Sequence, residues 1–227
     1  PLALTARGGE RGYLDMVFDT PQALARVRFL LRGGDDSLFC QVRIEPKEAI
    51  TAALLNLRCY PSAFITTGAR RVLTPVRELV QGEKAALGLG EEWWLFYYDA
   101  LADLGKVVGG RTGAGPCAVV WLPEEMLSGE CVVGSYAVDT RFALRVDRNE
   151  WRLAFLDYAG KSNAAAQADL QTRAEAIRAD LEAMDFDDPS LLRWPLADRQ
   201  AEAEELLATL PAQDERRAQF EAWAREL

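Results

Sequence analysis

Residues 117–158 constrain the fold more than any other part of the chain, because they contain four short apolar stretches separated by turn-forming residues. The stretches are CAVVWL at 117–122, ECVVGSY at 130–136, FALRV at 142–146 and WRLAFLDY at 151–158. They are rich in β-branched and aromatic residues, and the last two alternate along one face as half-buried strands do. A helix over 151–158 is the alternative, which the polar turn before it disfavours. This spacing predicts antiparallel strands in a sandwich or barrel.

Similar patterns occur toward the N-terminus. Proline has no N–H to donate to the hydrogen bonds of a central strand, so the stretch that contains Pro75 is expected at a sheet edge. The stretch 23–31 is ambiguous between strand and helix, and residues 49–57 could also be helical. The expected strands are 13–18, 23–31, 38–44, 53–60, 72–79 and 93–98. The sequence therefore predicts an antiparallel β-sandwich, jelly-roll or immunoglobulin-like, over residues 10–160.

After residue 160 the spacing becomes helical, and we expect a helical region over residues 161–227. Ser162 or Asn163 can cap a helix that runs to about residue 184. Its apolar residues recur every three or four positions and form a narrow seam. Two further helices are expected at 196–210 and 212–227, separated by Pro211.

The apolar seam of the first helix is too short for a stable isolated coiled coil. It must therefore pack on the sandwich, on neighbouring helices or on another chain. In the last case it would bind a partner or form an oligomer. The candidate residues are Leu170, Ile177, Leu181 and Met184.

Composition excludes several classes of function. The net charge of −9 argues against a nucleic-acid partner, since phosphate binding needs a basic surface. With 49% hydrophobic and 27% charged residues, the chain is expected to bury an ordinary core. No apolar run approaches the length of a membrane span.

The chain contains no histidine. This excludes Ser-His-Asp and Cys-His catalysis and His-ligated zinc for the chain acting alone. The paired carboxylates Asp35–Asp36 and Glu124–Glu125 lie in expected turns, where solvated acids are common. Calcium binding through Asp35, Asp36 or Asp139 lacks the spacing of an EF-hand. We therefore expect no metal site.

The glycine-rich segment 109–116 precedes a strand. A phosphate-binding loop precedes a helix and ends in Gly-Lys-Ser/Thr, which is missing here. We interpret the segment as a flexible connection and expect no cofactor.

The four cysteines are opposed in pairs if two hairpins form. Pairing 39–44 with 54–60 places Cys40 opposite Cys59, and pairing 117–122 with 130–136 places Cys117 opposite Cys131. Directly opposed residues are close enough for a disulfide. Two such bridges indicate an oxidising compartment, the periplasm or the cell exterior. The alternative is four buried thiols in a cytoplasmic protein.

The most unusual stretch is EEWWLFYYDA at 91–100, because a strand there is apolar on both faces. Such a strand is normally central and covered on both sides. Alternatively, one face is an open aromatic surface that stacks on a sugar ring or on an apolar partner. The candidate ligand-binding residues are Trp93, Trp94, Phe96, Tyr97 and Tyr98.

These features predict a non-catalytic binding or assembly protein of the periplasm or cell exterior. Its glycan or protein partner would bind the aromatic face, the acidic helical tail, or both. One alternative is a carboxylate-based glycoside hydrolase or lyase, in which acids from separate strands converge in a cleft. A second alternative is a structural subunit of a larger assembly.

Overall fold

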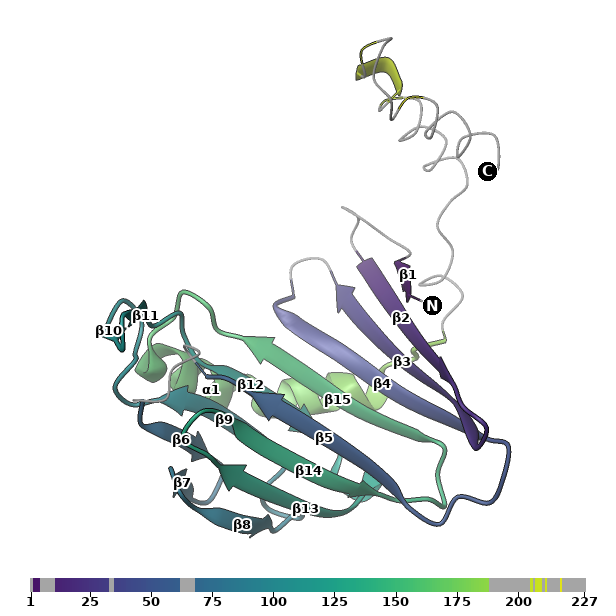
Figure 1. Cartoon of the computed structure of the whole chain (residues 1–227), viewed down its shortest axis with the longest axis horizontal. Coiled ribbons are helices and arrows are strands. Elements are labelled where there is room, and N and C mark those ends of the chain that lie inside the picture. Colours follow the sequence, from purple (N-terminus) through teal and green to yellow (C-terminus); the bar gives the residue numbers. More distant parts are fainter. Residues whose placement is uncertain are drawn as a thin grey trace.

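A computed structural model describes residues 2–4, 11–32, 35–61, 68–187, 205, 207–209, 211 and 217. Two antiparallel sheets face each other, with one long helix, α1 (Asn163–Ala183), behind the larger sheet (Figure 1). The prediction of an antiparallel β-sandwich with a helical appendage is confirmed.

The larger sheet has nine strands in the order β1-β2-β3-β4-β15-β12-β9-β6-β7. Their bounds are β1 Leu2–Leu4, β2 Arg11–Asp19, β3 Ala23–Arg32, β4 Ser37–Pro46, β15 Glu150–Asp157, β12 Cys117–Trp121, β9 Trp94–Asp99, β6 Arg70–Leu73 and β7 Glu78–Val80. The smaller sheet has four strands in the order β5-β14-β13-β8. Their bounds are β5 Ala53–Cys59, β14 Val138–Leu144, β13 Met126–Val133 and β8 Lys84–Leu87.

The core lies between the inner faces of the two sheets. The rings of Trp121 on β12 and Phe142 on β14 meet there with centroids 5.0 Å apart, and both side chains are fully buried. The smaller sheet leaves part of the larger one uncovered, because β1, β2 and β3 extend past the edge strand β5 (Figure 1). The inner face of these strands therefore has no opposing strand among the described residues.

The four strands within residues 117–158 are divided between the two sheets. The first and last of them, β12 and β15, pair with each other in the larger sheet, and the middle two, β13 and β14, pair in the smaller sheet. The short 3-10 helix Pro123–Glu125 connects β12 to β13, so these two strands do not form the expected hairpin. Strands β4 and β5 likewise belong to different sheets. Neither of the two hairpins required for the predicted cysteine pairing is present, so that prediction is wrong.

The other strands follow the sequence pattern with local differences. Strand β9 lies between β12 and β6, inside the larger sheet, as its apolar faces predict. The expected edge strand 72–79 is instead the hairpin of β6 and β7, because Pro75 lies in the turn between them. Strand β8 is not among the strands expected from the sequence.

The glycine-rich segment 109–116 packs against other parts of the chain and is not the flexible connection expected from the sequence. It begins in the turn between β10 (Val107–Val108) and β11 (Arg111–Thr112). A Cβ on Gly115 would lie 2.3 Å from the backbone oxygen of Tyr158, and Gly115 has φ +119°. The glycine thus permits a close backbone contact.

Helix α1 begins as the sequence predicts. The Ser162 hydroxyl accepts a hydrogen bond from the Ala165 N–H at 3.3 Å, which caps the helix. The expected helices at 196–210 and 212–227 fall almost entirely outside the described residues. Within the described part of the chain, no helix combines the length and apolarity needed to cross a bilayer.

Candidate binding groove between the sheets

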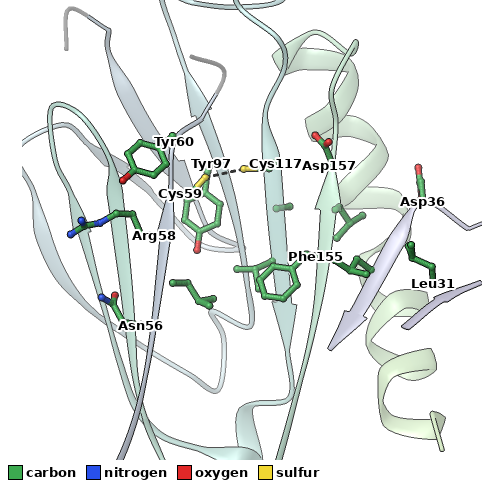
Figure 2. Close-up of a pocket in the computed structure, with 15 residues that line it drawn as sticks. Leu31, Asp36, Asn56, Arg58, Cys59, Tyr60, Tyr97, Cys117, Phe155 and Asp157 are labelled. Atoms are coloured by element: carbon green, nitrogen blue, oxygen red, sulfur yellow. Dashed lines mark hydrogen bonds between the residues drawn. The ribbon is translucent and has the colours of Figure 1, made fainter. Parts of the chain in front are cut away.

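A cavity of about 630 Å³ opens between β5 and the inner face of the larger sheet (Figure 2). We call it the inter-sheet groove. Its lining is mostly apolar, with polar side chains at the rim. It is lined by Leu31, Asp36, Leu38, Asn56, Leu57, Arg58, Cys59, Tyr60, Tyr97, Cys117, Ala118, Val119, Phe155, Leu156 and Asp157.

The floor of the inter-sheet groove is one row of directly opposed residues across four strands. Val119 on β12 is opposite Phe155 on β15, Phe155 is opposite Leu38 on β4, and Leu38 is opposite Leu31 on β3. Opposed residues share a face of the sheet, so these four side chains form a continuous apolar strip. Leu31, at its outer end, is 49% exposed.

Apolar residues continue this surface beyond the groove. On β3, Val27 and Ala25 share the face of Leu31 and lie opposite Met16 and Phe18 on β2. Phe18 is 52% exposed. The uncovered area is therefore larger than the groove itself, and its exposed apolar side chains are typical of a contact surface.

The roof of the groove is β5, the edge strand of the smaller sheet. Its alternating burial shows Leu55, Leu57 and Cys59 directed inward and Leu54 and Asn56 outward. One edge of β5 pairs with β14, and no described strand pairs with the other edge. Backbone groups along that edge are therefore available to another strand.

Two of the three charged residues at the rim, Arg58 and Asp36, form ion pairs. Arg58 donates hydrogen bonds to Asp139 at 2.7 and 3.2 Å. Arg173 forms an ion pair with Asp36, and its hydrogen bonds hold the pKa of that carboxyl below its usual value. The Asp157 carboxylate accepts a hydrogen bond from the Ala159 N–H at 2.9 Å.

Tyr97 is the member of the predicted aromatic set that lines the groove. Its hydroxyl and the Thr140 hydroxyl are hydrogen-bonded at 2.9 Å, and burial raises the pKa of Tyr97 well above its ordinary value. Trp93, Trp94 and Phe96 are buried in the core.

Tyr98 is half-buried and donates its hydroxyl hydrogen bond to Glu78. The structure therefore places the stretch 93–98 in packing on both faces of the sheet. It does not form the open aromatic surface that a stacked sugar needs.

The structure brings together a different pair of cysteines from the two predicted. Cys40 on β4 lies opposite Phe29 and Leu153, and Cys131 on β13 lies opposite Ala85 and Thr140. The Sγ atoms of Cys59 and Cys117 are 2.9 Å apart at the wall of the groove, where Figure 2 draws their contact. The expected pairings are wrong because strands adjacent in sequence here belong to different sheets.

Burial affects the thiols in different ways. It raises the pKa of Cys40 to about 12 and that of Cys131 to about 11, so both remain protonated at neutral pH. The hydrogen bond with Cys117, followed by burial, raises the pKa of Cys59. Because all four side chains are free thiols in this structure, disulfide formation remains a prediction.

Two of the other candidate acids, Glu125 and Asp35, have structural partners. Glu125 is buried and accepts hydrogen bonds from the backbone N–H and the Nε of Arg152, at 2.5 and 2.9 Å. Asp35 accepts from Arg32 at 2.7 Å. Within the described ranges, no group of three metal-ligating side chains lies close enough to hold a metal ion.

The helical residues proposed to bind a partner pack within the chain instead. Leu170, Ile177 and Leu181 are buried in the main core, and Met184 packs against it partly buried. The apolar seam of α1 thus packs on the larger sheet of the same chain. This is the alternative in which the helix does not bind a partner through that seam.

Sequence reasoning missed Leu31, Leu38, Val119 and Phe155 as functional candidates. Alternation in the sequence shows that such residues face inward. It does not show which inward positions lack a covering strand, because that depends on the extents of both sheets. The strand order is the observation that identifies the inter-sheet groove.

Comparisons with known proteins establish no family for the chain. No family model matches it, and no curated protein matches it. Among solved structures, a xanthan lyase from Paenibacillus is similar with 10% identity and a TM-score of 0.45 over 75% of this chain and 17% of that chain. A quadruple mutant of the α-N-acetylgalactosaminidase NagBb from Bifidobacterium bifidum is similar with 10% identity and a TM-score of 0.48 over 92% of this chain and 34% of that chain. Both neighbours are carbohydrate-active enzymes, and this chain spans about a third of their length or less.

Proposed function

We propose that the protein is a non-catalytic binding module whose inter-sheet groove receives an extended apolar segment of another protein or module. The observation that carries this proposal is the mismatch between the sheets. Among the described residues, the larger sheet has nine strands and the smaller has four, and the uncovered apolar face lies beside the edge of β5 that pairs with no described strand. An added strand would pair with β5 and extend the smaller sheet over this face.

The chemistry of the groove favours an extended protein segment over a sugar. An added strand offers the backbone donors and acceptors that the edge of β5 needs, and it directs alternate side chains toward the floor. Leu31, Leu38 and Phe155 give those side chains an apolar surface to bury. A sugar would need more polar partners than this floor supplies.

The Asp36 carboxylate at the rim does not resemble the general acid of a glycosidase. A glycosidase needs one carboxyl group that stays protonated near neutral pH. Asp36 is held ionised by Arg173, whose hydrogen bonds lower its pKa. This supports a binding role over the carboxylate-based enzyme considered from sequence.

The proposal is tested with a synthetic nine-residue peptide of alternating leucine and threonine, labelled for fluorescence anisotropy. We expect Leu31→Glu to weaken binding about tenfold or more, because the peptide would bury a charge. The matched control is Leu54→Glu, on the outward face of β5, where the leucine is 80% exposed. The Leu54→Glu variant should bind the peptide with the same affinity as the unmodified protein.

Backbone pairing is tested separately with the same peptide methylated at alternate amide nitrogens. Methylation removes donors and leaves the side chains in place, so we expect it to abolish binding. Slower hydrogen exchange of the β5 amides on adding the unmodified peptide would identify the edge used. Equal binding of both peptides, or an oligosaccharide that binds in the groove when the peptide does not, would overturn the proposal.

A further inference from the structure

Cys59 and Cys117 are the two thiols that approach each other across the sandwich. Cys59 is the last residue of β5 in the smaller sheet, and Cys117 is the first residue of β12 in the larger sheet. Their Sγ atoms are 2.9 Å apart, and both side chains are partly exposed and line the inter-sheet groove. They are thus placed for covalent bonding and open to a small reagent.

The other two cysteines lack these features. Cys40 and Cys131 are 2% and 0% exposed. The side-chain contact of Cys131 is a long hydrogen bond of 4.0 Å from the Thr140 hydroxyl, which a sulfur acceptor permits.

We propose that Cys59 and Cys117 form a disulfide that joins the two sheets at the wall of the inter-sheet groove and is made and broken by thiol–disulfide exchange. The oxidant is a low-molecular-weight disulfide. One cysteine thiolate attacks its sulfur and releases one small thiol, which leaves a mixed disulfide on the protein. The second cysteine then attacks the mixed disulfide and releases the other small thiol. Two protein thiols are oxidised, and one small disulfide is reduced to two thiols.

The reaction should be slow in the folded protein at neutral pH. The contact with Cys117 and burial both raise the pKa of Cys59, so little of its thiolate is present. Bond formation should therefore accelerate as the pH rises, since the thiolate is the nucleophile. A stable bridge would place the working protein in an oxidising compartment, in agreement with the periplasmic or extracellular location expected from sequence.

The bridge is tested on the unmodified protein, so the result does not depend on whether a variant folds. The folded protein is incubated with oxidised glutathione, its remaining thiols are blocked with N-ethylmaleimide after unfolding, and its digest is mapped without reduction. We expect a linked peptide pair containing Cys59 and Cys117, with Cys40 and Cys131 alkylated. Linkage of Cys40 to Cys59 or of Cys117 to Cys131, or alkylation of all four cysteines, would overturn the inference.

Stability gives a second measurement. The two cysteines are 58 residues apart in sequence. Closing a loop of this length should raise the melting temperature by about 10 °C relative to the reduced protein. Cys59→Ser should abolish the difference between oxidised and reduced protein, and Cys40→Ala should retain it. An equal melting temperature in both states of the unmodified protein would contradict the bridge.

One consequence rests on the proposed function. The bridge fixes the end of β5 against the floor strand β12, so the groove should be better organised and bind the leucine–threonine peptide several-fold more tightly when oxidised. A bridge without peptide binding in either state would refute the proposed function and leave the bridge standing. Peptide binding of equal strength in both states would refute this consequence alone.

Discussion

The side chains of Arg70 on β6 and Asp99 on β9 form an ion pair in which both are fully shielded from solvent. Asp99 also accepts hydrogen bonds from the N–H groups of Leu101 and Ala102, at 2.8 and 2.7 Å. The carboxylate therefore links the neighbouring strand to the turn that follows β9. Removing one partner of such a pair is strongly destabilising, because the other charge stays buried.

We expect Asp99→Asn to lower the free energy of unfolding by about 3–5 kcal/mol. Urea denaturation followed by tryptophan fluorescence measures the change. The control is Asp147→Asn, which breaks an exposed ion pair with Arg145 and should have little effect on stability. Equal effects of the two substitutions would show that the Arg70–Asp99 pair is not buried.

Gly68 lies against the same ion pair. A Cβ built on Gly68 would be 2.0 Å from Oδ2 of Asp99 and 2.4 Å from Nη1 of Arg70. Gly68→Ala should therefore displace the pair and destabilise the protein by about 1–3 kcal/mol, as overpacking does. Gly90→Ala is the control, because a Cβ there meets no atom within 4 Å. Comparing the two melting temperatures checks the prediction, and a neutral Gly68→Ala would contradict it.

Glu92 provides a pH-dependent contribution to stability. Burial raises the pKa of its carboxyl, but hydrogen bonds outweigh this and lower the pKa below the ordinary 4.5. The donors are Arg77 at 2.7 and 2.9 Å, the Gly88 N–H at 2.7 Å and the Thr74 hydroxyl at 2.9 Å. Because the folded pKa is the lower one, the contribution is present above pH 4.5 and is lost as the pH falls through the folded pKa.

Glu92→Gln should thus lower the free energy of unfolding by about 1–3 kcal/mol at pH 7. The difference from the unmodified protein should shrink as the pH falls below 4.5. Urea denaturation of both proteins at pH 7 and at pH 3.5 measures this, with exposed Glu91→Gln as the control. A difference that is the same at both pH values would contradict the assignment to the ionised carboxylate.

Helix α1 is expected to contribute to stability through its packing on the outer face of the larger sheet. Leu170 is fully buried, so Leu170→Ala should cost about 2–5 kcal/mol through lost burial and the cavity that remains. Gln171→Ala, at the adjacent exposed position, should have little effect. If Leu170→Ala were neutral in chemical denaturation, the seam would not be packed against the sheet as described.

Much of the fold could be predicted from the sequence because it depends on local periodicity. Alternation located most strands, and Ser162 marked the start of α1. The pairing of strands could not be predicted, because the connection Pro123–Glu125 crosses between sheets where a hairpin was expected. Cys117 therefore meets Cys59 rather than Cys131, although each cysteine lies on a predicted strand.

The candidate site was less accessible to sequence reasoning than the fold. The aromatic stretch 93–98 was the most conspicuous feature, and its two apolar faces reflect an interior strand. Leu31 and Phe155 have ordinary alternation, and their exposure results from the sheets having unequal numbers of strands. Such a difference in coverage is a property of the assembled sandwich, which no local pattern records.

The pairing of β4 with β15 joins segments more than a hundred positions apart along the chain. The nine-stranded sheet therefore cannot be completed until the chain has been synthesised through β15, which ends at Asp157. Ribosome-bound chains that end before Glu150 would leave β4 and β12 without their shared neighbour. Assembly should consequently be slow and late, and the incomplete sheet would be the stage most exposed to aggregation.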